Sequence, residues 1–598
     1  MLVGVSERGF HTNDDYGMSS LASGAFTGHP DGRLVYVNPL VGYPISWLYR
    51  LVPSMPWYAL SYYVVHCLAL AAIADVLVRR RRELGQLVTI TTAAVVFAVA
   101  PRFLLQLSFT TTAFMAALAG VVLTVDICLE PRWRQHLMRA ATAALLITVA
   151  LSIRQNAALA VLLVSSPLLA VVSFRRPRVG LSLTGLALGV WALNRLVVCF
   201  ILDANYRSFL AYNQLRGGLH GTPRISAEAL TPNLLSQIGW TSTDRGMFAY
   251  FLFDDRSLFG FESLQIITNN TSAVRKPFTR ALVVDGILTR YPWLLCAFAL
   301  TLVLVIFTRK WSGLLAGAGG TIAVAAMVWM GMTSRIPERT VLPIWVTLCV
   351  VAALSAALST PRALFIPVWI DRRVERLSAA IVAFVLVISF WTGLIGPGAT
   401  SWNPIWVTLC VVAALSAALS TPRALVIPVW IDRWVGSLSA AVIASVLVVS
   451  VWTGPIGPGA TSSHNLFRRG LLADSLDTIE AEAGDDIVVA YAGALPTQGI
   501  DPLSVTGPYS NERLLGLGWP TFSPMFEERK ANAGIDDTLR SILVRDDVVW
   551  VANRKVTGYY QRFLVREAGL DKGPVLVAAA CDKSEHICIW RKAGVHDG

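Results

Sequence analysis

Residues 58–82 read YALSYYVVHCLALAAIADVLVRRRR, an apolar run followed directly by four arginines. About 20 mostly apolar residues are enough to cross the hydrocarbon core of a bilayer as a helix. Lys and Arg collect in the loops that stay on the cytoplasmic side. The stretch therefore predicts a membrane-spanning helix whose C-terminal end lies at the cytoplasmic face.

The composition of the whole chain agrees with this interpretation. Of its 598 residues 55% are hydrophobic and only 15% are charged, with a mean hydropathy of +0.57, whereas about a quarter of the residues in a soluble protein are charged. These values exclude a wholly soluble enzyme and a disordered chain, and 8 Cys are too few for a disulfide framework. The net charge of +12 comes from basic clusters in short loops, so we assign it to membrane topology and expect no nucleic-acid partner.

The same alternation of apolar runs and short polar loops continues along the chain. Placing each Arg-rich loop in the cytoplasm puts every other loop outside, and this order never breaks between residues 58 and 454. The sequence predicts about twelve spans, near residues 58–78, 86–101, 109–128, 138–153, 157–173, 179–201, 291–307, 311–332, 341–359, 377–394, 402–420 and 438–454.

The predicted fold class is mainly α, a polytopic transmembrane helix bundle with a small C-terminal extracytoplasmic α/β or α+β domain. The N-terminal segment and the long polar loop also fall on the extracytoplasmic side, and we expect that the chain has lost a first membrane helix. The predicted regions are an N-terminal segment with an acidic pair (1–57), transmembrane helices (58–202), a loop (203–290), further transmembrane helices (291–454) and the C-terminal domain (465–598).

One predicted helical hairpin is duplicated. Residues 343–403 recur as residues 404–464, with the same offset of 61 throughout. Each copy contains two spans joined by a short basic loop, so the insertion preserves the topology of everything after it. Two copies are too few for a solenoid, and we interpret the repeat as a passive duplication rather than a two-fold site.

The composition changes near residue 465, where charged residues return and short β-rich runs appear at 486–491 and 548–551. Helices are predicted near 466–483, 536–545 and 557–568. Cys581 and Cys588 lie between two strand-like runs. They form either a cross-hairpin disulfide, which fits an oxidising exterior, or two free thiols.

Candidate site residues lie next to the spans rather than inside them. Asp14 and Asp15 are adjacent in the N-terminal segment. Adjacent carboxylates can hold a divalent metal, and one of them can act as a general base towards a hydroxyl. The alternative is a solvated acidic pair with no role in chemistry.

Several arginines converge on the predicted extracytoplasmic boundary, where topology alone would leave few. Guanidinium groups bind phosphate through two parallel hydrogen bonds. The alternative for each is snorkelling or pairing with a neighbouring carboxylate. The candidates for binding a lipid-linked phosphate are Arg102, Arg154, Arg335 and Arg339.

At the level of architecture, and in the run Asn13-Asp14-Asp15-Tyr16…Asn38-Pro39-Leu40…Pro56-Trp57-Tyr58 with Gly518-Trp519-Pro520-Thr521 in the tail, the chain resembles bacterial polytopic proteins placed near the GT-C glycosyltransferases. Members of that superfamily are membrane enzymes that take sugar from a polyprenyl-phosphate donor. The resemblance implies that Asp14 or Asp15 is the catalytic carboxylate and that the other binds metal.

The functional hypothesis is a membrane glycosyltransferase that moves a sugar from a polyprenyl-phosphate donor to a glycan or lipid acceptor of the cell envelope. Its partners are membrane lipids, and its only expected cofactor is a divalent metal. The alternatives are a non-catalytic flippase or transporter of envelope lipid or polysaccharide, and an inactive paralogue. P-loop, Rossmann, Cys-x-x-Cys and H-E-x-x-H motifs do not occur in the sequence.

Overall fold

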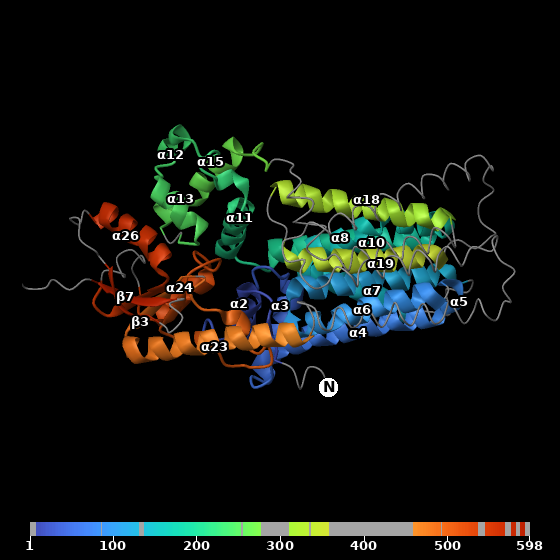
Figure 1. The fold of residues 1–598 in the computed structure, drawn as a ribbon, viewed down its shortest axis with the longest axis horizontal. Coiled ribbons are helices and arrows are strands. Elements are labelled where there is room, and N and C mark those ends of the chain that lie inside the picture. The colour runs from blue at the N-terminus through green and yellow to red at the C-terminus, as the bar shows by residue number, and fades with distance from the viewer. Residues whose placement is uncertain are drawn as a thin grey trace, which may run out of the picture.

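The computed structural model places a helical bundle at one end and a small mixed sheet with helices at the other, with two short N-terminal helices between them (Figure 1). The long helix α23 (Pro458–Ala483) runs from the bundle along the sheet. The described residues are 7–84, 86–130, 137–252, 255–276, 310–333, 337–357, 458–491, 493–535, 545–568, 576–581 and 587–592.

The bundle is built from long apolar helices. Within the described ranges, six helices are long and apolar enough to cross a membrane, and a shorter apolar helix covers Arg339–Ser355. The predicted spans near 291–307, 377–394, 402–420 and 438–454, with most of the duplicated hairpin, lie outside the described residues, so the count of twelve stays a prediction. The bundle comprises α4 (Trp57–Arg79), α5 (Arg81–Leu84), α6 (Gln86–Leu105), α7 (Phe109–Leu129), α8 (Leu137–Val164), α9 (Ser166–Arg175), α10 (Pro177–Phe200), α18 (Lys310–Thr333) and α19 (Glu338–Ala357).

Helix α8 reverses the direction of the chain at Arg154, the one residue within it that has non-helical backbone angles (φ −152°, ψ 92°). Arg139, near its start, lies 3.6 Å from Asp126 in the last turn of α7. Arg154 lies against Phe109, the first residue of α7, and Arg176 donates to the Glu130 carbonyl just beyond the end of α7. The chain therefore runs along α7 twice between residues 139 and 176, once in each direction.

The predicted spans at 138–153 and 157–173 thus appear as one helical element with a turn at Arg154, followed by α9. The second interruption comes at Ser165, just before Pro167 in the first turn of α9. Proline has no N–H to donate to the preceding turn, which accounts for the break there.

The described part of the polar loop forms short helices that lie above the sheet region in the view of Figure 1. They are α11 (Ala204–Leu219), the 3-10 turn η2 (Pro223–Ile225), α12 (Pro232–Gln237), α13 (Ser242–Ala249), α14 (Arg256–Phe259) and α15 (Phe261–Asn270).

The C-terminal region contains a five-stranded sheet of order β4-β3-β5-β7-β6. Strand β3 pairs in parallel with β4 and β5, while β7 pairs antiparallel with β5 and β6. The parallel strands IVVA and VVWVA are buried throughout, as continuous apolar runs predict. The elements are β3 (Ile487–Ala490), η4 (Thr497–Gly499), η5 (Pro508–Ser510), β4 (Leu514–Gly516), α24 (Pro524–Asn532), β5 (Val548–Ala552), α26 (Arg554–Ala568), β6 (Leu576–Cys581) and β7 (Cys588–Lys592).

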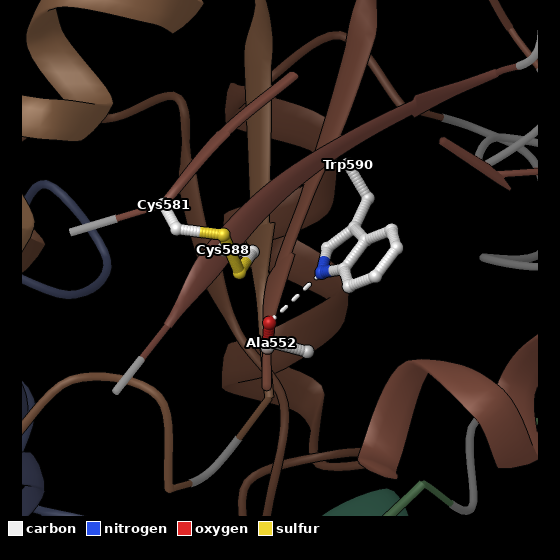
Figure 2. The surroundings of a disulfide bond; sticks show 4 residues. All are labelled: Ala552, Cys581, Cys588 and Trp590. Carbon is white, nitrogen blue, oxygen red and sulfur yellow. Dashed lines mark hydrogen bonds between the residues drawn. A yellow bond between two sulfur atoms is a disulfide. The ribbon is translucent and has the colours of Figure 1, made fainter. Parts of the chain in front are cut away.

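The predicted disulfide is confirmed. Cys581 and Cys588 face each other across β6 and β7 and are bonded (Figure 2). On the other side of β7, Trp590 Nε1 donates to the Ala552 carbonyl over 2.9 Å (Figure 2). The disulfide therefore cross-links the edge strand β6 to β7, and the Trp590 hydrogen bond joins β7 to β5.

The N-terminal segment lies between the bundle and the C-terminal region. It contains β1 (Gly9–Phe10), α2 (Asn13–Ser23) and α3 (Pro39–Leu51), and β1 pairs in parallel with β2 (Gln106–Leu107), which follows α6. Asn465 on α23 donates to the carbonyls of Glu7 and Leu105, and so bonds both to this segment and to α6. Arg8 pairs with Asp501 at 2.6 Å.

A buried arginine joins the C-terminal region to the loop after α2. Arg529 on α24 is 1% exposed and donates to the carbonyls of Ala25 and Phe26 at 3.2 and 3.0 Å. It also donates to the carbonyls of Asn511 and Leu514. Its bonds are to neutral carbonyls, which makes the position a geometric clamp rather than an ion pair.

We expect Arg529→Met to lower the free energy of unfolding by about 3 kcal/mol, because four backbone carbonyls lose their charged donor and the bonds to two of them, Phe26 and Leu514, are buried. Chemical denaturation of the purified protein in detergent measures the loss. Arg513→Met is the matched control, since Arg513 pairs with Asp485, whose side chain is 98% exposed, and it should cost less than about 1 kcal/mol. Equal losses for the two variants would contradict the clamp.

Candidate functional site

The site begins at the first turn of α2, where the N-terminal segment meets the bundle. Thr12 is extended (φ −138°, ψ 158°), and the helix starts at Asn13. Asp14 and Asp15 fall in its first turn, where the helix dipole favours negative charge. Consecutive positions on a helix point in different directions, so the two carboxylates have different surroundings.

Asp15 points into the protein and is fully buried. Its Oδ1 accepts the backbone N–H of Phe109 at 2.8 Å, and its Oδ2 accepts the Thr12 hydroxyl at 2.7 Å. Burial raises the pKa of this carboxyl from 3.8 to about 7, although the hydrogen bonds from Phe109 and Thr12 and the charge of Arg339 oppose the rise. Asp15 thus anchors α2 on the N-terminus of α7.

Asp14 points the other way and is 27% exposed. Its Oδ2 lies 3.6 Å from Nη1 of Arg339 in the first turn of α19, and the same Nη1 donates to the Thr12 hydroxyl at 3.2 Å. Arg339 is itself 13% exposed. One carboxylate and one guanidinium therefore face the same space, and both side chains are mostly buried.

Arg154 approaches the same cluster from the turn in α8. Its guanidinium carbon lies 5.2 Å from the centre of the Phe109 ring and 5.5 Å from that of Tyr36. The Arg339 guanidinium also lies over Phe109, at 5.7 Å. Rings hold cations over their faces, so Phe109 carries one guanidinium from each of two helices while its backbone amide holds Asp15.

A first cavity of about 350 Å³ opens between α2, the start of α19 and the C-terminal region. A Cβ on Gly17 would lie 2.7 Å from Trp519, so only glycine lets this ring pack so closely against α2. The polar and aromatic lining includes His11, Thr12, Asn13, Asp14, Arg339, Thr497, Gln498, Phe26, Phe251, Tyr491, Tyr509 and Trp519.

A second cavity of similar size lies between α3, α8, α10 and α11. Arg154 and Arg195 both line it, with the amides of Gln155 and Asn194. Arg195 lies over the Trp191 ring at 5.8 Å. Within the described part of the chain, no carboxylate pairs with either arginine.

The structure brings together three of the predicted site residues beside Asp15, namely Asp14, Arg154 and Arg339. Arg102, half-buried in the last turn of α6 after Pro101, lines neither cavity. Arg335 lies outside the described residues. The two aspartates were equivalent in the sequence, whereas in the structure Asp14 lines the first cavity and Asp15 lines neither of the two.

Several residues of the site were not predicted from the sequence. Thr12 and Phe109 make the contacts that orient the carboxylates, and the Arg154 guanidinium lies over the Tyr36 ring. The polar residue before a helix start at Asn13 was a signal for Thr12. Phe109 and Tyr36 had no such signal, because aromatic residues near a span end are common at membrane interfaces.

The donor set does not fit a metal held by the protein alone. No group of three or more His, Cys, Asp or Glu side chains gathers within the described ranges, and Asp15 uses both oxygens on Phe109 and Thr12. Mg²⁺ takes near-octahedral oxygen coordination, of which Asp14 beside a guanidinium supplies too little.

No protein-family model and no curated protein matches the chain. Among solved structures, it is similar to ArnT from Cupriavidus metallidurans bound to undecaprenyl phosphate, with 14% identity and a TM-score of 0.44 over 100% of this chain and 96% of that one. The apo form of ArnT gives 13% identity and a TM-score of 0.45, over 98% and 95% of the two chains. Similarity at this level assigns neither a family nor a function.

We expect Asp15→Asn to flatten the dependence of thermal stability on pH. The raised pKa means that the stability contributed by protonated Asp15 is complete below about pH 4 and is lost as the pH rises through 7. Asn keeps an acceptor for Phe109 N–H and never ionises. The melting temperature of the variant should exceed that of the wild type at pH 8 and approach it at pH 5. A parallel pH dependence in both proteins would contradict the assignment.

Proposed function

We propose that this protein is an integral membrane glycosyltransferase that transfers a sugar from a polyprenyl-phosphate donor to an acceptor of the cell envelope on the extracytoplasmic side. The observation that carries the proposal is the pairing of Asp14 with Arg339 at 3.6 Å on the wall of one cavity, with the Arg154 and Arg339 guanidinium groups both over the Phe109 ring. A base and cations at this spacing suit the transfer of a group away from a phosphate.

The second cavity suits the head group of the donor. Arg154 and Arg195 supply two guanidinium groups without carboxylate partners among the described residues, and amides from α8 and α10 surround them. Helix α10 exposes apolar side chains, including Leu188 at 61% and Leu196 at 52%. A lipid lying along α10 would therefore present its phosphate to these arginines while its chain stayed in hydrocarbon.

The first cavity suits the sugar and the acceptor. Aromatic faces from Trp519 and Tyr509 lie with the amides of Asn13 and Gln498 around Asp14. Its volume of about 350 Å³ is that of a small-molecule site. The aromatic and amide lining supports a carbohydrate ligand better than an apolar one.

The reaction uses Asp14 as the base. Its carboxylate takes the proton from an acceptor hydroxyl, whose oxygen then bonds to the anomeric carbon of the donor sugar. The bond from that carbon to the phosphate oxygen breaks, and polyprenyl phosphate leaves with the electron pair. Arg339 and Arg154 stabilise the charge that develops on the phosphate, and attack opposite the leaving group inverts the anomeric configuration.

The Cys581–Cys588 disulfide supports the extracytoplasmic placement of the C-terminal region, because disulfides persist in oxidising compartments. The first cavity includes residues of that region, so the proposed site lies on the same side of the membrane.

We expect Asp14→Asn to lower sugar transfer by at least about 100-fold, the contribution of a positioned general base. Radiolabelled transfer from polyprenyl-phosphate sugars in membranes measures it, with Asp485→Asn as a control at a fully exposed carboxylate. Binding of undecaprenyl phosphate should be retained in the Asp14 variant. Equal transfer with and without the Asp14 carboxylate would remove the base, and lipid binding without any transfer in the wild type would favour a carrier.

A further inference from the structure

Thr12 holds the position of a helix cap without capping the helix. A threonine before the first helical residue normally accepts a backbone N–H of the first turn, but the Thr12 side chain makes no such bond. Its hydroxyl donates instead to Asp15 Oδ2 at 2.7 Å and accepts from Arg339 Nη1 at 3.2 Å. The hydroxyl thus connects a buried carboxyl to an arginine on the cavity wall.

A second Thr-x-x-Asp sequence in the chain shows the ordinary arrangement. Thr241 accepts the N–H of Asp244, and Asp244 accepts the N–H of Thr241, which makes a capping box for α13. Arg566 donates to Thr241 and also to both oxygens of Asp244, at 2.7 and 2.8 Å. The Thr241 hydroxyl also donates to Asp244 Oδ2 at 2.8 Å. The carboxylate and the arginine contact each other directly there, however, so their pairing does not depend on the threonine.

At the first site the carboxyl and the arginine do not touch. The other oxygen of Asp15 accepts the Phe109 N–H, and Arg339 faces Asp14. We propose that Thr12 is a positioning residue that transmits the protonation state of Asp15 to Arg339 and so sets the Asp14–Arg339 pair. Its meaning for catalysis rests on the proposed function, although the contact itself does not.

The direction of the hydrogen bond is the basis of the coupling. An ionised Asp15 can only accept, so the Thr12 proton points to it and a lone pair of the hydroxyl faces Arg339. A protonated Asp15 can donate to that hydroxyl, competes for its lone pairs and no longer attracts the guanidinium. Arg339 is therefore held more firmly when Asp15 is ionised.

The surroundings of Asp15 allow this change near neutral pH. The groups that face it are Asp14 and Thr12 on its own segment, Arg339 and Arg154 from α19 and α8, the Phe109 amide of α7, and Tyr58 and Tyr62 of α4. Burial dominates over these neighbours and raises the pKa of Asp15 to about 7. Both protonation states are thus accessible.

The test measures how readily phenylglyoxal modifies Arg339 in the full-length protein in detergent. Peptide mass spectrometry gives the modification of Arg339 relative to Arg513, a half-exposed arginine paired with Asp485, in the same sample. We expect this ratio to fall about fivefold between pH 6 and pH 8 in the wild type, the effect of gaining one hydrogen bond to a charged group. It should be independent of pH in Thr12→Val.

Two variants separate positioning from stability. Thr12→Ser keeps the hydroxyl and should restore the pH dependence. Thr241→Val removes the hydroxyl of the capping box and should lower the melting temperature without altering the Arg339 ratio. A wild-type ratio that does not change with pH, or a Thr12→Val ratio that changes as in the wild type, would overturn the proposal. The measurement needs no turnover, so absence of sugar transfer would refute the proposed function and leave the relay intact.

Discussion

The hydrogen bond from the Phe109 amide to the buried Asp15 carboxyl is the contact on which the site depends. It fixes the first turn of α2 on the first turn of α7, where the free N–H groups of a helix end attract a carboxyl. With Asp15 turned inward, its neighbour Asp14 must face the cavity. The Phe109 side chain adds a second contact at this position, because the guanidinium groups of Arg154 and Arg339 lie over its ring.

Three distant parts of the chain must fold together before this cluster exists. The aspartates come from the N-terminal segment, the arginines from two bundle helices, and the opposite wall from the C-terminal region. Arg529 and Asn465 hold the N-terminal segment from the C-terminal side through bonds to backbone carbonyls. Every residue has a backbone carbonyl, so these hydrogen bonds hold the N-terminal segment in place without depending on which side chains it carries there.

The sequence predicted the features that follow from periodicity and charge. Alternation of apolar runs with basic loops placed Arg154 between two crossings, and the structure has the chain reversing there. The inference that Arg154 and Arg339 approach the acidic pair needed only that all lie at one membrane face. Arg102 satisfied the same rule yet lines neither cavity. Topology predicts how deep a residue lies in the membrane, but it does not predict on which side of the helix bundle the residue lies.

The division of roles between Asp14 and Asp15 could not be predicted, because it depends on the backbone amide of a residue 94 positions away. A backbone donor has no signature in the sequence. Thr12 was likewise hidden, since a threonine before a helix predicts a cap, and only the geometry shows that its hydroxyl is used elsewhere. In this cluster tertiary contacts therefore replace the hydrogen bonds that local rules predict.

The charges around the two cavities favour an anionic ligand over a neutral one in the proposed reaction. Arg154 and Arg195 have no carboxylate partner among the described residues, and Arg339 shares Asp14 at a distance longer than a hydrogen bond. Arg195 is exposed, but Arg154 is half-buried, and a guanidinium group there without a counter-ion raises the free energy of the empty site because water screens its charge poorly. A phosphate entering from the lipid side would neutralise this excess, whereas a neutral sugar alone would leave it. In the proposed reaction the donor phosphate would complete the charge balance, and the aromatic wall around Asp14 would orient uncharged hydroxyl groups.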